Sequence, residues 1–139
     1  MNKIVRMEEA SERYDLAGKV IGFAMKIHST LGSGFLETVY QRALDLELTR
    51  AGLKVEAEKP ISVRYEGEVV GAFIADLLVN DVLIVETKAV QMLAKIHEVQ
   101  LVNYLVATGI DEGLLLNFGA ERLEFKKKFR RPKPQTASL

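Results

Sequence analysis

The chain of 139 residues contains no cysteine and only two histidines. Without cysteine neither a disulfide framework nor a thiolate zinc site can form, and two histidines cannot build a zinc site by themselves. No apolar run reaches membrane-spanning length, and the charged start of the chain lacks the apolar stretch of a signal peptide. These absences predict a cytoplasmic protein that has no membrane partner.

Two common catalytic motifs are missing as well. The Gly32-Ser33-Gly34 turn has no predicted strand before it and no Gly-Lys-Ser/Thr sequence, so a P-loop is excluded. The chain contains no Gly-x-Ser-x-Gly elbow, which excludes a serine nucleophile of that kind.

Charge of one sign does not dominate, because 19 basic residues balance 19 acidic ones. Their distribution is uneven, however, since residues 126–139 hold six Lys or Arg and no acid. We therefore expect a single domain over residues 1–125 and a basic C-terminal tail over residues 126–139. Such a tail either adds nonspecific affinity for phosphates or only keeps the chain solvated.

Hydrophobic periodicity predicts an α/β protein. Apolar residues recur with helical spacing over residues 15–31, 36–48 and 93–108, and glycines follow each of these stretches. Extended patterns cover residues 61–65, 69–79, 82–85 and 114–118. Residues 82–85 are apolar on both faces, as expected for a central strand. The order is ααβββαβ, with the helices covering a sheet.

Asp76 and the Glu86-Thr87-Lys88 triplet lie on two of these strands, joined by a short turn. Two carboxylates at one point of a sheet repel each other unless a cation lies between them, and a hard divalent ion with oxygen ligands is the usual partner. Lys88 points to the same face as Glu86 and could orient a water beside the ion. A strand carboxylate satisfied by backbone donors and a surface ion pair are the alternatives.

The register of the two strands decides whether the acids meet. A two-residue Asn80-Asp81 loop would place Ala75 opposite Glu86 and turn Asp76 to the other face. A three-residue loop or a bulge would place Asp76 opposite Glu86. We predict the second register, because Asn and Asp both tolerate left-handed backbone conformations.

Four segments of the chain resemble motifs of one known family. They are Gly34-Phe35-Leu36-Glu37-Thr38-Val39-Tyr40, Asp76 with Glu86-Thr87-Lys88, Gln100-Leu101-Val102-Asn103-Tyr104, and Leu115-Leu116-Asn117-Phe118-Gly119. The first is similar to the signature of the GxxExxY proteins, which are assigned to the PD-(D/E)XK nuclease superfamily. This resemblance implies a restriction-endonuclease-like mixed β-sheet flanked by helices.

The resemblance also implies roles for individual residues. Asp76 and Glu86 would bind Mg²⁺ or Mn²⁺, with the backbone carbonyl of Thr87 as a further ligand. Lys88 would orient or activate the attacking water, and Glu37 would reach the same ion. An acid in the first turn of a helix is also favoured by the helix dipole alone, so Glu37 has a second interpretation.

Gln100 and Tyr104 lie one helical turn apart and would together contact the substrate. On the residues alone, an ordinary helix surface, where Gln100 is solvated and Tyr104 packs by its ring, is the preferred interpretation. We read His97 as a neighbour of this face rather than a ligand, and His28 as a surface residue near a helix end.

These patterns support three functional hypotheses. The first is a metal-dependent nuclease that hydrolyses phosphodiester bonds of DNA or RNA. The second is a nuclease fold without turnover that binds nucleic acid or protein, which the acidic body and short chain favour. The third is a charged cluster that only stabilises the fold. A homodimer is compatible with the apolar helix faces.

Overall fold

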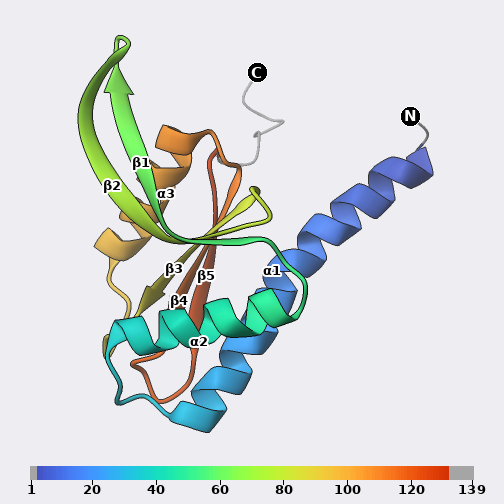
Figure 1. Cartoon of the computed structure of the whole chain (residues 1–139), viewed down its shortest axis with the longest axis vertical. Coiled ribbons are helices and arrows are strands. Elements are labelled where there is room, and N and C mark those ends of the chain that lie inside the picture. Colours follow the sequence, from blue (N-terminus) through green and yellow to red (C-terminus); the bar gives the residue numbers. More distant parts are fainter. Residues whose placement is uncertain (1–2, 132–139) are drawn as a thin grey trace, which may run out of the picture.

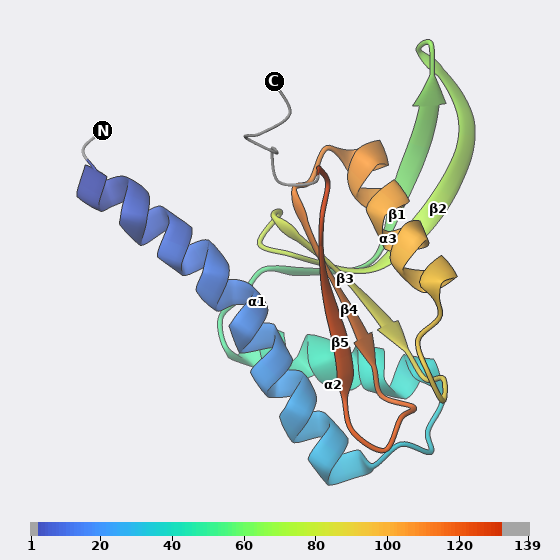
Figure 2. The same cartoon turned by 180° about the vertical axis from the view of Figure 1, so that it is seen from behind.

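The computed structural model describes residues 3–131, with side chains from Leu16 onward. Five strands form one mixed sheet in the order β1-β2-β3-β4-β5, and helices cover both of its faces (Figures 1 and 2). In chain order the elements are α1 (Lys3–Leu31), α2 (Glu37–Arg50), β1 (Val55–Tyr65), β2 (Glu68–Val79), β3 (Leu83–Lys88), α3 (Lys95–Thr108), β4 (Glu112–Asn117) and β5 (Glu124–Phe129).

The two N-terminal helices end where glycine follows the apolar pattern. Gly32 has φ +74° and its N–H donates to the carbonyl of His28 at 2.9 Å, which closes α1. α1 begins at Lys3 and not near Asp15, because the charged start of the chain continues the helix without apolar spacing. No helix within residues 3–131 is long and apolar enough to cross a membrane.

The layers give the protein two cores. On one face of the sheet, α1 and α2 pack on a cluster that includes Leu44, Leu77, Val85 and Leu116. On the other face, α3 packs on a smaller cluster that includes Leu101 and Ile84. β3 is the middle strand and is covered on both sides, as its continuous apolar run predicted. The parallel β3–β4 pair is joined by α3.

The loop between β2 and β3 has three residues and sets the predicted register. Asn80 and Asp81 both have left-handed φ angles, 51° and 59°, and Val79 pairs with Leu83. The pairing continues through Leu78 with Ile84 and Leu77 with Val85. The next position in this register brings Asp76 opposite Glu86, so the predicted register is confirmed.

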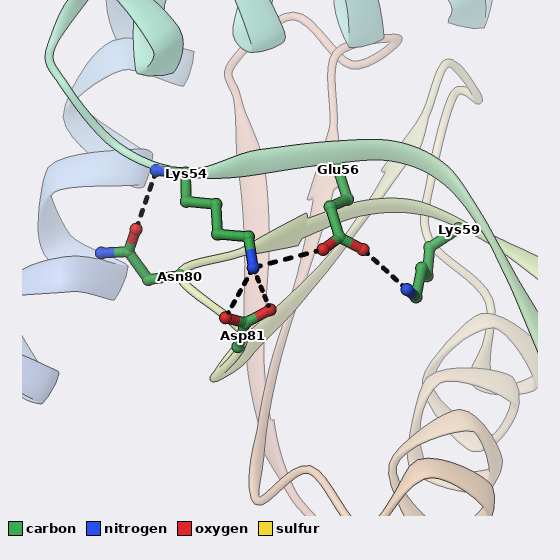
Figure 3. Close-up of polar contacts among 5 residues, drawn as sticks. All are labelled: Lys54, Glu56, Lys59, Asn80 and Asp81. Carbon is green, nitrogen blue, oxygen red and sulfur yellow. Dashed lines mark hydrogen bonds and ion pairs between the residues drawn. The ribbon is translucent and has the colours of Figure 1, made fainter.

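Polar contacts anchor this loop to the start of β1 (Figure 3). The Lys54 backbone N–H donates to Asn80 Oδ1 at 2.9 Å, and its carbonyl accepts from the Asn80 N–H at 2.8 Å. The Lys54 ammonium lies 2.9 Å from Asp81 Oδ2 and 3.5 Å from Glu56. Because the ion pairs are exposed, they position the loop more than they stabilise the fold.

A fifth strand corrects both the predicted element order and the extent of the basic tail. β5 pairs antiparallel with β4, with Lys126 opposite Leu115, so residues 126–129 belong to the sheet. Lys128 lies 2.6 Å from Glu98, and Arg130 lies 2.8 Å from Asp111. The lysine-rich pattern concealed a strand because charged side chains are tolerated at a sheet edge. Residues 132–139 lie outside the described residues.

His28 is not the surface residue that the sequence predicted. Its ring is half-buried, and Nε2 donates to the carbonyl of Ala120 at 2.9 Å. The ring also lies 6.4 Å from that of Phe118. His28 thus ties the end of α1 to the loop between β4 and β5, a long-range contact that helical spacing does not reveal.

Candidate active site

β2 changes face at Asp76. Ala75 packs in the cluster on the α3 side, whereas Leu77 packs on the side of α1 and α2, although residues two apart in a regular strand share a face. Across the ladder, Glu58 has a left-handed φ of 52°, and the Glu58–Asp76 pair is missing while the neighbouring positions pair on both sides. In both strands the regular alternation of side chains between the two faces of the sheet is therefore interrupted at the same place, and in β2 this place is Asp76.

Glu58 holds a conformation that costs an L-residue about 1–2 kcal/mol. We expect Glu58→Gly to raise the free energy of unfolding by about 0.5–1 kcal/mol, because glycine removes this penalty but gains flexibility in the unfolded chain. We expect Glu58→Val to lower it by about 2 kcal/mol, since β-branched residues avoid positive φ. Urea unfolding measures both values. Glu68→Val on exposed β2 is the control, and equal effects at 58 and 68 would contradict the prediction.

Beyond Leu77 and Val85 the β2–β3 ladder stops, and side chains take over its backbone hydrogen bonds. The Asp76 N–H donates to Glu86 Oε1 at 3.1 Å. The Thr87 N–H and Oγ1–H both donate to Asp76 Oδ2, at 2.8 and 3.0 Å. The strands thus separate at the point where the two acids meet, which holds both carboxylates in the gap.

Gln41 completes this arrangement from α2. Its Nε2 donates to the backbone carbonyl of Asp76 at 3.4 Å, and the side chain is buried at 8% exposure. Sequence reasoning missed Gln41, although it lies four residues after Glu37 and therefore on the same face of the helix. Thr87 was also assigned only a backbone role, whereas its side chain contacts Asp76.

Glu86 is buried beside a second negative charge. Burial first, and then the Asp76 carboxylate, raise the pKa of Glu86 from 4.5 to about 8, against the lowering effect of a backbone hydrogen bond from Asp76 and of Lys88. Lys88 is half-buried two residues later on the same strand. One nearby ammonium is therefore insufficient to keep Glu86 ionised at neutral pH.

Glu37 joins the same electrostatic environment from the first turn of α2. Burial raises the pKa of Glu37, Lys88 lowers it, Asp76 raises it and His97 lowers it. Strand and helix residues far apart in sequence thus interact across one site. His97 also accepts a hydrogen bond from the Ala94 N–H on Nδ1 at 3.0 Å, so it lies beside the site as a neighbour.

Tyr40 fixes the start of α2, where Glu37 is the first residue. The Tyr40 hydroxyl donates to the carbonyl of Gly32 at 2.6 Å and accepts from the Phe35 N–H at 3.1 Å. Its fully buried ring stacks on Phe118, with centroids 4.6 Å apart. Tyr40 thus clamps the turn that begins α2, and it joins two of the motifs noted in the sequence.

Tyr104 reaches the site from α3, whereas Gln100 does not contact it. Burial raises the pKa of Tyr104, and the charges of Glu86 and Asp76 raise it further. Its ring stacks on Phe73, with centroids 3.7 Å apart. Gln100 is exposed one turn earlier and makes no hydrogen bond with the described acids.

Asn117 fixes the chain that leaves the site after Lys88. Its Oδ1 accepts from the N–H groups of Val90 and Gly119, both at 3.0 Å, and its Nδ2 donates to the Val90 carbonyl at 2.9 Å. The Lys88 carbonyl accepts from the Phe118 N–H at 2.8 Å. The end of β4 therefore holds the backbone of Lys88 in place, a role that the sequence did not predict.

The donor chemistry of the site suits a hard divalent cation. Two carboxylates lie together, one of them with a pKa raised partly by the other, and a cation between them would relieve this repulsion. In the part of the chain whose side chains are described, no three His, Asp or Glu residues converge as a ready metal cluster. A metal would therefore rest on Asp76 and Glu86 as the protein pair, with further oxygen ligands around it.

A comparison with models of protein families identifies the superfamily of the chain. A family model described as the PD-(D/E)XK nuclease superfamily matches residues 14–131, and the chain belongs to that superfamily. Its fold is restriction-endonuclease-like, a mixed sheet flanked by helices. Nucleases of this superfamily generally use divalent metals.

A solved structure described as the crystal structure of SSO0001 is similar, with a TM-score of 0.52 and 16% sequence identity. The match covers 69% of this chain and 50% of that one, so this chain spans about half the length of that protein. At this identity the similarity concerns the fold alone. The comparison with curated proteins gave no match.

Proposed function

We propose that the protein is a metal-dependent nuclease of the GxxExxY type that hydrolyses phosphodiester bonds of nucleic acid. The observation that supports this most is the gap between β2 and β3, where Asp76 meets Glu86 and Lys88 follows on the same strand. Superfamily membership supports the same reaction class.

In this proposal Asp76 and Glu86 hold Mg²⁺ or Mn²⁺, with the Thr87 carbonyl as a further ligand, and Glu37 reaches a water bound to the ion. A bound divalent ion supplies Lewis-acid activation of the phosphate and of the attacking water. The Lys88 ammonium donates a hydrogen bond that orients this water and offsets the local negative charge. Thr87, through its two hydrogen bonds, fixes the rotamer of Asp76.

Tyr104 and Gln100 contact the substrate strand in this proposal. Tyr104 already lies near both acids, and Gln100 is exposed on the same helix, free to meet a bound strand. DNA and RNA are both candidate substrates. The cytoplasmic location and the homodimer remain predictions.

Cleavage assays test the proposal directly. We expect purified protein to cut labelled DNA or RNA with Mg²⁺ or Mn²⁺ and to leave both intact in chelator. Lys88→Ala should abolish this cleavage, because the water loses its orienting group. Gel electrophoresis of single-stranded and duplex substrates measures the products.

Lys19→Ala, at an exposed position on α1, is the matched control and should cut like the wild type. Thermal unfolding of each variant checks that the fold is kept. No cleavage of any substrate, or cleavage that Lys88→Ala leaves unchanged, would contradict the proposal.

A second candidate is a nuclease fold that binds nucleic acid or protein without turnover. The two Thr87 donors favour it, because they satisfy Asp76 without any metal. Nucleic-acid binding that persists in chelator and in Asp76→Ala, with no cleavage, would support this alternative. If Asp76→Ala changed only the melting temperature, the cluster would serve the fold alone.

A further inference from the structure

A groove lies between the β1–β2 hairpin and α3, next to the acidic site. The hairpin curves past the rest of the sheet and runs beside α3 (Figures 1 and 2). The groove between them has a volume of about 630 Å³. Its lining includes Ser62, Arg64 and Phe73 from the hairpin and Asn103, Tyr104 and Val106 from the helix.

We propose that this groove holds an unpaired nucleotide of a single-stranded nucleic acid whose adjoining phosphate lies at the acidic site. The inference rests on the proposed nuclease function, and it names the form of the substrate. It adds a binding element, the hairpin, that none of the sequence motifs indicated.

The size of the groove favours one nucleotide over a duplex. A volume of about 630 Å³ is in the range of sites that enclose a small molecule, whereas a double helix needs an open channel. One base with its sugar fills such a space. The substrate strand would therefore have to be unpaired at this position.

The lining suits a base and a phosphate. Phe73 and Tyr104 form a stack of two half-buried rings, a surface on which a base can lie whatever its sequence. Ser62 and Asn103 are exposed and offer hydrogen-bonding groups to the edge of a base.

Charge supports the same occupant. Arg64 is the one charged residue in the lining, which has no carboxylate although the chain has as many acids as bases. The Arg64 guanidinium uses Nη1 to donate to the Gly67 carbonyl at 3.3 Å, so its other donors can meet a phosphate. A negatively charged strand thus finds a cation here and no repelling acid.

Tyr104 connects the groove to the acidic site. It lines the groove, and its pKa is raised partly by Glu86 and Asp76. A strand seated on Tyr104 would therefore have its next phosphate close to the two carboxylates.

Binding in chelator tests the groove without involving hydrolysis. Fluorescence anisotropy would compare a labelled oligothymidylate of about 12 nucleotides, the RNA equivalent, and a duplex of the same length. We expect the single strand to bind about tenfold more tightly than the duplex. Arg64→Ala and Val106→Glu should each weaken single-strand binding about tenfold, through loss of a phosphate contact and through added negative charge.

Matched controls lie away from the groove. Arg50→Ala changes an exposed arginine at the end of α2, and Leu46→Glu adds an acid at an exposed apolar position of the same helix. Both should bind the single strand like the wild type. Because Val106 is 63% exposed, Val106→Glu should keep the fold, which thermal unfolding verifies.

The outcomes separate the groove from the nuclease. If the wild type cleaves nucleic acid but the groove variants bind single strands normally, or if the duplex binds as well as the single strand, the groove inference fails and the proposed function stands. If the groove variants lose single-strand binding while no substrate is ever cleaved, the groove inference is supported and the proposed nuclease activity is contradicted. If no oligonucleotide binds to the protein, the inference that the groove holds a nucleotide is contradicted.

Discussion

Replacing Glu86 by glutamine is expected to stabilise the metal-free protein at alkaline pH and to change little at acidic pH. The pKa of Glu86 is about 8 in the fold and 4.5 ordinarily. Below pH 4.5 the carboxyl is protonated whether the chain is folded or unfolded. As the pH rises from 4.5 to 8, only the unfolded chain releases the proton, so stability falls. The loss is on the order of 5 kcal/mol and is complete above pH 8.

Glutamine removes this loss because it stays neutral and can still accept the hydrogen bond from the Asp76 N–H through its amide oxygen. Urea unfolding between about pH 4 and pH 9 measures the difference. Glu68→Gln, at an exposed position, is the control and should follow the wild type. Parallel curves for the wild type and Glu86→Gln would contradict the buried-acid interpretation.

The same variant also reports on the proposed metal. A cation between the two acids lets Glu86 ionise, so Mn²⁺ should restore part of the stability that the wild type loses at alkaline pH. At a concentration of about 100 times the dissociation constant, binding contributes roughly 2.7 kcal/mol. Glu86→Gln should show little of this effect. Equal stabilisation of both proteins by Mn²⁺ would place the ion elsewhere.

Gly119→Ala is expected to be the most destabilising single-methyl change in the described part of the protein. A Cβ at this position would lie 2.4 Å from the backbone N and O of Val90 and 2.5 Å from the carbonyl carbon of Ala89. Backbone atoms cannot move aside as a side chain can, and Asn117 holds Val90 in place through two hydrogen bonds. The loop after Lys88 must therefore shift, at a cost of about 3 kcal/mol.

A loss of this size corresponds to a fall in melting temperature of roughly 10 °C for a domain of this length. Calorimetry measures it. Gly22→Ala is a control that should change the free energy of unfolding in the opposite direction. A Cβ at this position has no neighbour within 4 Å, and alanine favours the helix more than glycine does. The free energy of unfolding should therefore rise by about 0.5–1 kcal/mol. If Gly119→Ala melts like the wild type, the segment from Ala89 to Val90 is not held as tightly as the contacts indicate.

Local patterns predicted much of the fold. Helical spacing located α2 and α3 within a few residues, because each helix buries one stripe of apolar side chains. β5 was missed because three consecutive lysines break any alternating apolar pattern, and only pairing with β4 makes the segment a strand. The left-handed residue Glu58 gave no signal either, since glutamate has no preference for that conformation.

The sequence by itself determined which chemical groups are available: Asp76, Glu86 and Lys88, at spacings that follow from two strands and a short loop. Loop chemistry at Asn80 and Asp81 also determined the register, because left-handed backbone preferences are local. Only the tertiary structure decided that the strands separate at Asp76, that Gln41 and Thr87 occupy the freed hydrogen bonds, and that Tyr104 lies close by. Those contacts join segments distant in sequence, and their geometry depends on how two cores pack against one sheet.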